Sequence, residues 1–406
     1  MTLERTRGRL MVWPAPQIMS RFENWFIDKL FANLHKGELD ITLPSGTHRH
    51  FRAAQPGTKA TVSLNSWRTV RRVIAAESVG LAKAYIDGDW TTPDLTAFLM
   101  LLAENGPQLD AAFAGKFRNL DRLRHWFNDN SLRGSRRNIS FHYDLGNDFY
   151  KLWLDDSMTY SSALYPDADS SLEQAQQAKL ARIADMLQVA KGQKVLEIGC
   201  GWGALARHVA EKGASVVGLT LSQEQKRFAE DKIVETGKQS QIEIRLQDYR
   251  ETKGEFDKIV SIEMLEAVGE AYWPVYFAAV RDRLKAGGRA VIQTITIEES
   301  RYEGYRRGTD FIQRFIFPGG MLPTPTIVQE QAAKVGLKLI ENQNFGLSYA
   351  ATLAEWRRRF HNVTHELQAL NYDIKFRRMW EYYLCYCEAG FRSGVINVGL
   401  FSFEHA

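Results

Sequence analysis

From residue 171 onward, apolar residues alternate between helical spacing and short continuous runs. Ser171-Leu-Glu-Gln174 has the form of a capping box, and the apolar stripe after it predicts a helix. Alternating strands and helices are typical of a parallel sheet with helices on both faces, so we expect an α/β fold here. Runs rich in Val, Ile and Leu predict five strands, with helical segments between them, at residues 194–198, 215–219, 242–246, 258–262 and 290–295.

The N-terminal 125 residues have a mixed pattern. Apolar residues at helical spacing predict helices, and runs bounded by turn residues predict strands. A chain of 406 residues is long enough for two domains. We therefore expect a smaller α+β domain at residues 1–125, a linker at 126–140 and an α/β domain at 141–406. In the first domain, helices are expected at residues 19–34, 67–84 and 95–104, and strands at 39–43 and 61–64.

A cluster of cations lies at residues 116–137 and includes two aromatic residues, Trp126 and Phe127. Asn128, Asn130 and Gly134 break helices and favour a linker. Two interpretations remain open. The cluster is either a solvated charged surface or a surface that meets lipid phosphates while the aromatic rings enter the headgroup region. Its cations are Lys116, Arg118, Arg122, Arg124, Arg133, Arg136 and Arg137.

The composition and net charge of the chain give only a weak indication of what the protein binds. Hydrophobic residues make up 45% and charged residues 25% of the chain, as in ordinary globular proteins. The net charge of +4 mildly favours an anionic surface such as a membrane, and we expect no nucleic acid partner. Cys385-Tyr-Cys387 lacks the spacing of a metal site, so we expect no metal and three reduced thiols. No apolar run reaches the length of a membrane span or a signal peptide, which predicts a cytoplasmic protein in peripheral contact with the inner face of the membrane.

The strongest local motif is Val195-Leu-Glu-Ile-Gly-Cys-Gly-Trp-Gly203. A predicted strand runs into Gly199, Gly201 and Gly203, and a helix follows them. Glycine permits the tight turn and lets the backbone approach a ligand closely. Glu197 stands at the carboxyl end of the strand, where open α/β sheets bind ligands. The strand, turn and helix therefore predict a nucleotide-like cofactor at this edge.

A nicotinamide dinucleotide is the rival to S-adenosylmethionine as this cofactor. Its fingerprint needs G-x-G-x-x-G and an acid about 20 residues later. The glycines here follow G-x-G-x-G, and the second strand ends in Gly218-Leu-Thr-Leu-Ser222 without an acid. S-adenosylmethionine has no phosphate to cradle and fits better. Asp248 and Tyr249, after the third strand, are either placed to meet its adenine or lie on an exposed loop.

Several ordered motifs resemble the cyclopropane-fatty-acyl-phospholipid synthases and the related mycolic acid methyltransferases. The resemblance implies a Rossmann-like class I methyltransferase domain that follows a smaller lipid-binding domain. The N-terminal part of the chain resembles the family's lipid-binding domain more loosely, through the segment Tyr85-Ile-Asp-Gly-Asp-Trp90. A homodimer is possible. The matching motifs are His142-Tyr-Asp-Leu-Gly-Asn-Asp-Phe-Tyr150, Met158-Thr-Tyr-Ser161, Leu196-Glu-Ile-Gly-Cys-Gly-Trp-Gly203, Gly218-Leu-Thr-Leu-Ser222, Ile316-Phe-Pro-Gly-Gly320 and Ser348-Tyr349.

The resemblance implies a reaction on a cis double bond in an acyl chain of a membrane phospholipid. The alkene takes the methyl group of S-adenosylmethionine, a carbocation forms, and a base removes a proton from the new methyl so that a cyclopropane ring closes. In the family this base is a bound bicarbonate. An aromatic and anionic pocket suits such a cation.

The resemblance also assigns residues to two sites. The methionine end of the cofactor would be covered by Tyr143 and Tyr160, with His142 nearby. The cofactor would be held by Glu197, Gly199, Thr220, Leu221 and Gln225, and the bicarbonate by Ser162, Glu266, Gln293, Ile295 and Tyr349.

Three positions depart from the best-known members of the family. Cys is usual at Ser162, His is usual at Gln293, and a His often follows the glutamate where this chain has Ala267. Ser and Gln can still donate hydrogen bonds to a bicarbonate oxygen. These differences leave two alternatives to ring formation. One is a methyl- or methylene-branched chain, for example a precursor of a furan fatty acid, and the other is a non-catalytic lipid-binding protein.

Overall fold

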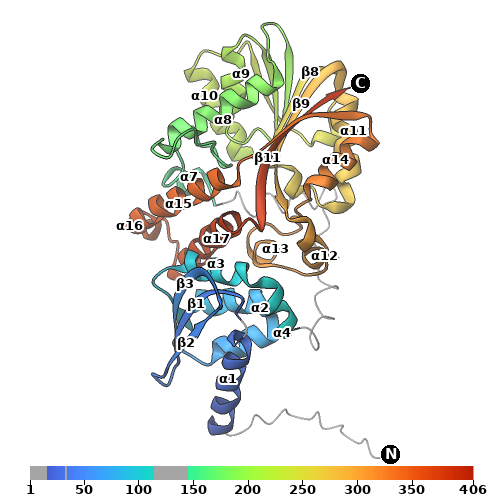
Figure 1. Cartoon of the computed structure of the whole chain (residues 1–406). Coiled ribbons are helices and arrows are strands. Elements are labelled where there is room, and N and C mark those ends of the chain that lie inside the picture. The colour runs from blue at the N-terminus through green and yellow to red at the C-terminus, as the bar shows by residue number, and fades with distance from the viewer. Residues whose placement is uncertain (1–15, 33, 114–144, 406) are drawn as a thin grey trace, which may run out of the picture.

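The computed structural model describes residues 16–32, 34–113 and 145–405, which form an N-terminal α+β unit and a C-terminal α/β unit (Figure 1). The N-terminal unit contains a four-stranded sheet with the order β2-β1-β3-β4. β1 is antiparallel to β2 and parallel to β3. Its elements are α1 Pro16–Phe31, β1 Lys36–Thr42, β2 His48–Arg52, β3 Gln55–Leu64, α2 Arg68–Ile86, β4 Trp90–Thr91, α3 Leu95–Glu104 and α4 Gly106–Phe113.

Alternating burial along β1 and β3 creates one apolar face of this sheet. Leu39, Ile41 and Val62 are almost fully buried, and their polar neighbours point the other way. α3 packs against β3 on this face. Its first turn is capped by the Asp94 carboxylate, which accepts a hydrogen bond from the Ala97 N–H at 2.9 Å. The expected small α+β unit is therefore present.

The C-terminal unit is built on a seven-stranded sheet with the order β10-β11-β9-β8-β5-β6-β7. β11 runs antiparallel to both of its neighbours, while β9, β8, β5, β6 and β7 are parallel. This arrangement is that of a class I methyltransferase, as expected. The strands are β5 Lys194–Ile198, β6 Ser215–Thr220, β7 Ile242–Leu246, β8 Phe256–Ile262, β9 Leu284–Ile297, β10 Leu337–Asn344 and β11 Ile396–His405.

Helices cover both faces of this sheet (Figure 1). α8, α9 and α10 lie on one face, and α11 and α14 lie on the other. α8 begins with the predicted capping box, in which Ser171 and Gln174 exchange side-chain and backbone hydrogen bonds. The helices are α7 Asn147–Lys151, α8 Leu172–Leu187, α9 Ala204–Glu211, α10 Gln223–Glu235, α11 Trp273–Arg283, α12 Glu299–Arg307, α13 Phe311–Phe315, α14 Pro325–Lys334, α15 Gly346–Asn362, α16 Thr364–Ala369 and α17 Ile374–Arg392, with 3₁₀ turns η2 Tyr249–Glu251, η3 Leu265–Ala267 and η4 Glu270–Tyr272.

The two units meet along α17, which packs against α2, α3 and α15. The Tyr85 hydroxyl donates to Glu381 at 2.8 Å, and the Arg378 guanidinium lies 4.4 Å from the Tyr85 ring centre. Arg378 also donates to the backbone carbonyls of Tyr85 and Trp90. The segment Tyr85–Trp90, which carries the resemblance in the N-terminal unit, therefore forms part of the joint.

The predicted bounds agree with the structure within two residues for β5, β6, β7, β8 and α3, whereas β9 begins six residues before its predicted start at residue 290. Four strands were not predicted, namely β2, β4, β10 and β11. The cationic cluster at 116–137 and the expected linker lie outside the described residues. Across the part of the chain that is described, no helix is both long enough and apolar enough to cross a bilayer.

Candidate active site

The glycine motif forms the turn between β5 and α9, as predicted. Gly199, Gly201 and Gly203 have φ values of 81°, 52° and 80°, a region that glycine enters without strain. A Cβ on Gly201 would meet nothing within 4 Å, so open space lies beside this residue. Gly199 and Gly201 line a large cavity of about 510 Å³ at the carboxyl ends of the parallel strands. Gly203 caps α9 and is not part of the cavity wall.

Glu197 presents an acceptor to this cavity from the end of β5. Its side chain is buried, and burial raises the pKa of its carboxyl to about 8, although Arg207 and the Ala206 amide favour the charged form. One carboxylate oxygen, Oε2, has no hydrogen-bond partner among the residues that the structure describes. A buried acceptor of this kind requires a donor, and a hydroxyl-bearing ligand in the cavity would supply it.

The next two strand ends supply further predicted residues to the cavity wall: Thr220, Leu221, Gln225, Asp248 and Tyr249. The Thr220 hydroxyl donates to Gln225 Oε1 at 2.8 Å, which fixes both side chains. The Asp248 carboxylate accepts two hydrogen bonds from the Arg250 guanidinium at 2.9 and 2.7 Å. The Asp248 carboxylate is thus already paired inside the protein, and the half-buried Tyr249 ring lines this end of the cavity.

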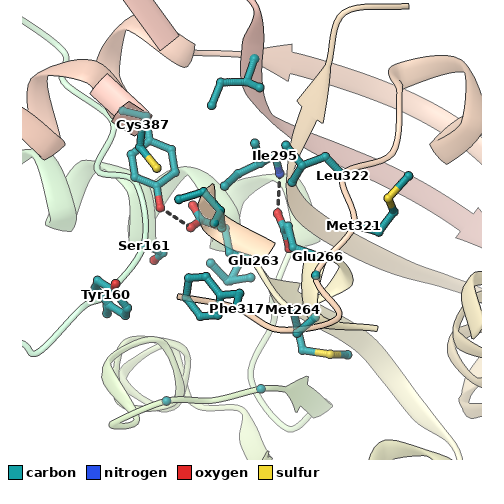
Figure 2. A pocket seen from close by; sticks show the side chains of 18 of the residues that line it. Tyr160, Ser161, Glu263, Met264, Glu266, Ile295, Phe317, Met321, Leu322 and Cys387 are labelled. Atoms are coloured by element: carbon teal, nitrogen blue, oxygen red, sulfur yellow. Dashed lines mark hydrogen bonds between the residues drawn. The ribbon is translucent and has the colours of Figure 1, made fainter. Parts of the chain in front are cut away.

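Two glutamates that follow β8 lie together at the centre of the cavity wall, Glu263 and Glu266 (Figure 2). Of these, only Glu266 was predicted. Glu263 has a φ of 49°, which is uncommon for a residue with a side chain. Strain of this kind persists where surrounding contacts fix it and often occurs at functional sites.

The Glu263 carboxylate is held by three donors from three separate segments. Oε1 accepts from the Ser162 backbone N–H at 2.9 Å and from Gln293 Nε2 at 2.7 Å. Oε2 accepts from the Tyr349 hydroxyl at 2.6 Å. Ser162, Gln293 and Tyr349 are the residues that were expected to surround a bicarbonate. They converge as predicted, but on a carboxylate of the protein itself.

Glu266 is held differently. Its Oε1 accepts from the Ile295 backbone N–H at 2.5 Å and from the Thr294 hydroxyl at 3.0 Å, while Oε2 is buried and has no partner in the described part of the chain. Burial, and then the charge of Glu263, raise the pKa of Glu266 to about 8. Two carboxyl groups that share a buried site do not both ionise readily. Glu266 is therefore the protonated member of the pair at neutral pH.

Lys179 from α8 supports the negative charge on Glu263. Its ammonium group is buried and donates to the Ser161 hydroxyl at 2.7 Å. Burial lowers the pKa of Lys179 to about 8, and the nearby charge of Glu263 acts in the opposite direction. Burial also raises the pKa of Glu263, but its three donors and Lys179 favour the ionised form. Glu263 therefore carries the charge of the pair.

Aromatic side chains surround the same space. Tyr160 lines the cavity, and its hydroxyl shares a hydrogen bond of 2.8 Å with the Tyr383 hydroxyl. The Tyr349 ring stacks on Phe391 with centroids 4.4 Å apart. Phe317 also lines the cavity and is drawn with Glu263 and Glu266 in Figure 2. His142 and Tyr143, which were expected near the cofactor, lie outside the described residues.

The cavity continues away from the glycine turn into an apolar branch. Residues of both units line it, because α2 and α3 of the N-terminal unit reach the wall. Polar groups occupy one end, at β5 and β8, and carbon-rich side chains occupy the other. The apolar lining includes Leu81, Leu99, Leu102, Phe317, Met321 and Leu322.

Comparison with known proteins agrees with this architecture. The family model described as mycolic acid cyclopropane synthetase matches residues 130–401. The chain belongs to this family. The family member described here is 39% identical over 347 residues to the tuberculostearic acid methyltransferase UfaA1 of Mycobacterium tuberculosis, covering 81% of this chain and 79% of the relative. It is 37% identical over 331 residues to the cyclopropane-fatty-acyl-phospholipid synthase of Escherichia coli, covering 81% and 83% of the two chains.

Two solved structures extend the comparison to the fold of this family member. The cyclopropane synthase MmaA2 from Mycobacterium tuberculosis superimposes with a TM-score of 0.62 at 32% identity, over 66% of this chain and 97% of that one. The mycolic acid cyclopropane synthase CmaA1, solved with S-adenosylhomocysteine (SAH) and CTAB, gives a TM-score of 0.62 at 31% identity, with the same coverage. The predicted family and fold are confirmed.

Proposed function

We propose that this protein transfers the methyl group of S-adenosylmethionine to a cis double bond in an acyl chain of a membrane phospholipid and closes a cyclopropane ring. The observation that carries the proposal is the cavity itself. It joins a glycine turn suited to a nucleoside with an apolar branch suited to an acyl chain, and a buried carboxylate pair lies between them. The relatives named for phospholipid and mycolic acid cyclopropanation support the same substrate class.

The residues present fit S-adenosylmethionine. Glu197 Oε2 lacks a donor, and the ribose hydroxyls would supply one. The open space beside Gly201 leaves room for the methionine part of the cofactor, and Tyr249 would lie against the adenine. Thr220, Leu221 and Gln225 would form the remaining wall of the nucleoside site. When bound, the cofactor supplies an electrophilic methyl group.

The chain's own residues would position the alkene and protect the cation. Tyr160 and Phe317 offer ring faces, which attract positive charge. The charge on Glu263 lowers the energy of a nearby cation, and the apolar branch keeps water away from it. The ionised Glu263 thus places a negative charge near the reacting carbon, and the buried Lys179 ammonium partly balances it.

The residues present do not fit a bicarbonate between Ser162, Gln293 and Tyr349. The hydrogen-bond donors of these residues are already directed at Glu263. The Ser162 hydroxyl donates instead to the Ala163 carbonyl at 2.9 Å. The Ile295 N–H, the remaining donor assigned to bicarbonate, is bonded to Glu266. A bicarbonate at this position would need these donors and would lie against an existing negative charge.

We also propose a peripheral membrane contact through α1, which lies at the end of the molecule remote from the seven-stranded sheet (Figure 1). Phe22 and Trp25 are exposed on this helix, at 48% and 53%. Arg21 and Lys29 are exposed beside them, and the Lys29 ammonium lies 5.0 Å from the Trp25 ring centre. Exposed aromatic residues flanked by cations favour an anionic lipid surface. The cationic cluster at 116–137, a cytoplasmic location and a homodimer remain predictions.

A second product deserves testing because the relative that is 39% identical is named for tuberculostearic acid, a methyl-branched fatty acid. The same methyl transfer gives a branched chain when the cation is resolved without ring closure. Formation of either product uses the same cavity and the same carboxylate pair until the cation has formed. Both products therefore share the methyl transfer step and differ only in the fate of the cation.

Expression of the gene in a bacterial host without such an enzyme tests the proposal. We expect unsaturated phospholipid acyl chains to gain one CH₂, and proton NMR to show ring protons at high field. Signals of a branching =CH₂ group would indicate the branched product instead, which forms when a hydride shifts to the cationic carbon and the new methyl then loses a proton. The host carrying the Gly201→Val variant serves as the control, and unchanged lipids with the unaltered protein would reject the proposed function.

A further inference from the structure

We infer that Glu263 is a catalytic residue that itself accepts the proton released when the ring closes, in place of a bound bicarbonate. This inference rests on the proposed function. Its basis is the convergence of Ser162, Gln293 and Tyr349 on the Glu263 carboxylate at the cavity wall. A site built to hold a small anion thus contains an anion that belongs to the chain.

The hydrogen-bond pattern leaves one oxygen of Glu263 able to accept a proton. Each carboxylate oxygen has two lone pairs. Both pairs of Oε1 are used, by the Ser162 N–H and the Gln293 amide, whereas Oε2 receives only the Tyr349 hydroxyl. The second lone pair of Oε2 has no partner among the hydrogen bonds of the described residues. Because Glu263 lines the cavity, that lone pair can meet a substrate proton.

The surroundings keep Glu263 in the ionised form that a base requires. The buried Lys179 ammonium lies close enough to stabilise the charge, and Glu266 holds its own proton. The backbone supports the same placement. Glu263 stays in the left-handed region, with φ 49°, and its N–H donates to the Gln293 carbonyl at 2.8 Å. This turn and its hydrogen bonds hold the carboxylate toward Gln293 and Tyr349.

The step balances without a further reactant. The alkene electron pair forms a bond to the methyl carbon, and the bond from that carbon to sulfur breaks with its electron pair left on sulfur. The other alkene carbon becomes cationic. A C–H bond of the new methyl then breaks. Its electron pair forms the second ring bond, and the proton passes to Glu263, which becomes a carboxylic acid and later releases the proton to water.

Bicarbonate dependence separates this inference from the expected family arrangement. We would assay the purified protein with S-adenosylmethionine and vesicles of unsaturated phospholipid, in buffer freed of carbon dioxide. We expect the unaltered protein to keep its full rate there. Glu263→Gln, which keeps the shape but removes the base, should lose about a hundredfold or more in turnover. Its affinity for S-adenosylmethionine should remain.

Glu263→Gly provides a rescue test. Glycine accepts the left-handed φ of this position, and removal of the side chain frees the three donors for a small anion. Added formate or bicarbonate should restore activity to Glu263→Gly but not to Glu263→Gln, whose side chain fills the space. Glu270→Gln is the matched control, because Glu270 lies on the same connection and pairs with Arg306 outside the cavity.

The outcomes are distinct. A bicarbonate requirement in the unaltered protein, or full turnover in Glu263→Gln, would overturn the inference and leave the proposed function intact. Transfer of no methyl group to lipid by the unaltered protein would overturn both. Melting temperature and cofactor affinity of each variant show that the fold is retained, and the rescue by anions is a readout that a purely structural role of Glu263 would not produce.

Discussion

Replacing Tyr349 with Phe removes one oxygen and leaves the surrounding packing in place. The ring would keep its stacking on Phe391, at 4.4 Å between centroids. The deleted hydroxyl is the only donor to Glu263 Oε2 among the hydrogen bonds of the described residues. The variant therefore tests whether the charge on Glu263 matters for turnover.

The size of the effect follows from this hydrogen bond. A hydrogen bond to a charged group contributes about 1.5–3 kcal/mol. Since about 1.4 kcal/mol corresponds to a tenfold change in an equilibrium constant, loss of the donor should disfavour ionisation of Glu263 by about ten- to a hundredfold and so raise its pKa. Other titratable groups that face Glu263 are Lys179, Glu266 and Cys387. A base must be ionised, so activity is lost as the pH falls through the pKa of Glu263.

The assay is the pH dependence of kcat with vesicle substrate. In Tyr349→Phe the acidic limb should move upward by about 1–2 pH units, in line with the lost hydrogen bond. At alkaline pH, where Glu263 is ionised again, kcat of the Tyr349→Phe variant should recover in part. Because the shift concerns ionisation, KM for S-adenosylmethionine should stay close to its original value. An acidic limb at the same pH in both proteins would refute the assignment of Glu263 as the ionised base.

Three further predictions concern the cofactor, the membrane and stability. Gly201→Val should abolish binding of S-adenosylmethionine in calorimetry, because a β-branched side chain at φ 52° would enter the cavity; Gly237→Val, at φ 65° on the surface, is the control for backbone strain and should bind normally. Trp25→Glu should weaken co-sedimentation with anionic vesicles, whereas Val234→Glu, at another exposed site, should not. Both Glu197 and Glu266 have a pKa of about 8 in the folded protein, against an ordinary value of 4.5. The folded state therefore binds more protons between these values, and the free energy of unfolding should fall as the pH rises, by at most about 1.4 kcal/mol per pH unit for each group. Urea unfolding of Glu266→Gln should show a shallower decline, and an unchanged slope would contradict the raised pKa.

β5, β6, β8 and β9 could be predicted because most of their residues are buried and their sequences are rich in apolar residues, whereas β7, at the edge of the sheet, was predicted from its alternating apolar residues. β10 was not predicted, since it lies at the edge of the sheet, and its sequence Leu-Lys-Leu-Ile-Glu-Asn-Gln-Asn is mostly polar and largely exposed. β11 is buried, but short apolar runs of this kind do not distinguish a strand from a helix.

The sequence predicted several residues of the site but not Glu263, the carboxylate on which they converge. Ser162, Gln293 and Tyr349 do converge, as the family motifs implied. Glu263 was overlooked because in sequence it is one more acid before a predicted helix. Only the left-handed turn at Glu263 directs its carboxylate toward donors from three distant segments. The nearby Glu266 offered the one available clue, since two acids three residues apart after a strand can share a site.

The hydrogen bonds to Glu263 bear on the position where Ser162 departs from the family pattern. Ser162 replaces a residue that is usually Cys, yet its contribution to Glu263 is the backbone N–H. The side chain at this position is thus free to vary without loss of that donor. We expect Ser162→Cys to have similar activity, whereas changes at Gln293 act directly on the Glu263 carboxylate, at 2.7 Å.

The most direct test of the central claim follows the methyl carbon itself. Purified protein would be incubated with S-adenosylmethionine that carries a ¹³C-labelled methyl group and with vesicles of unsaturated phospholipid, and the lipids would be examined by ¹³C NMR. The account predicts that the label enters the acyl chain as a ring CH₂ attached to both former alkene carbons. Label on the headgroup, or none in the lipid, would contradict it.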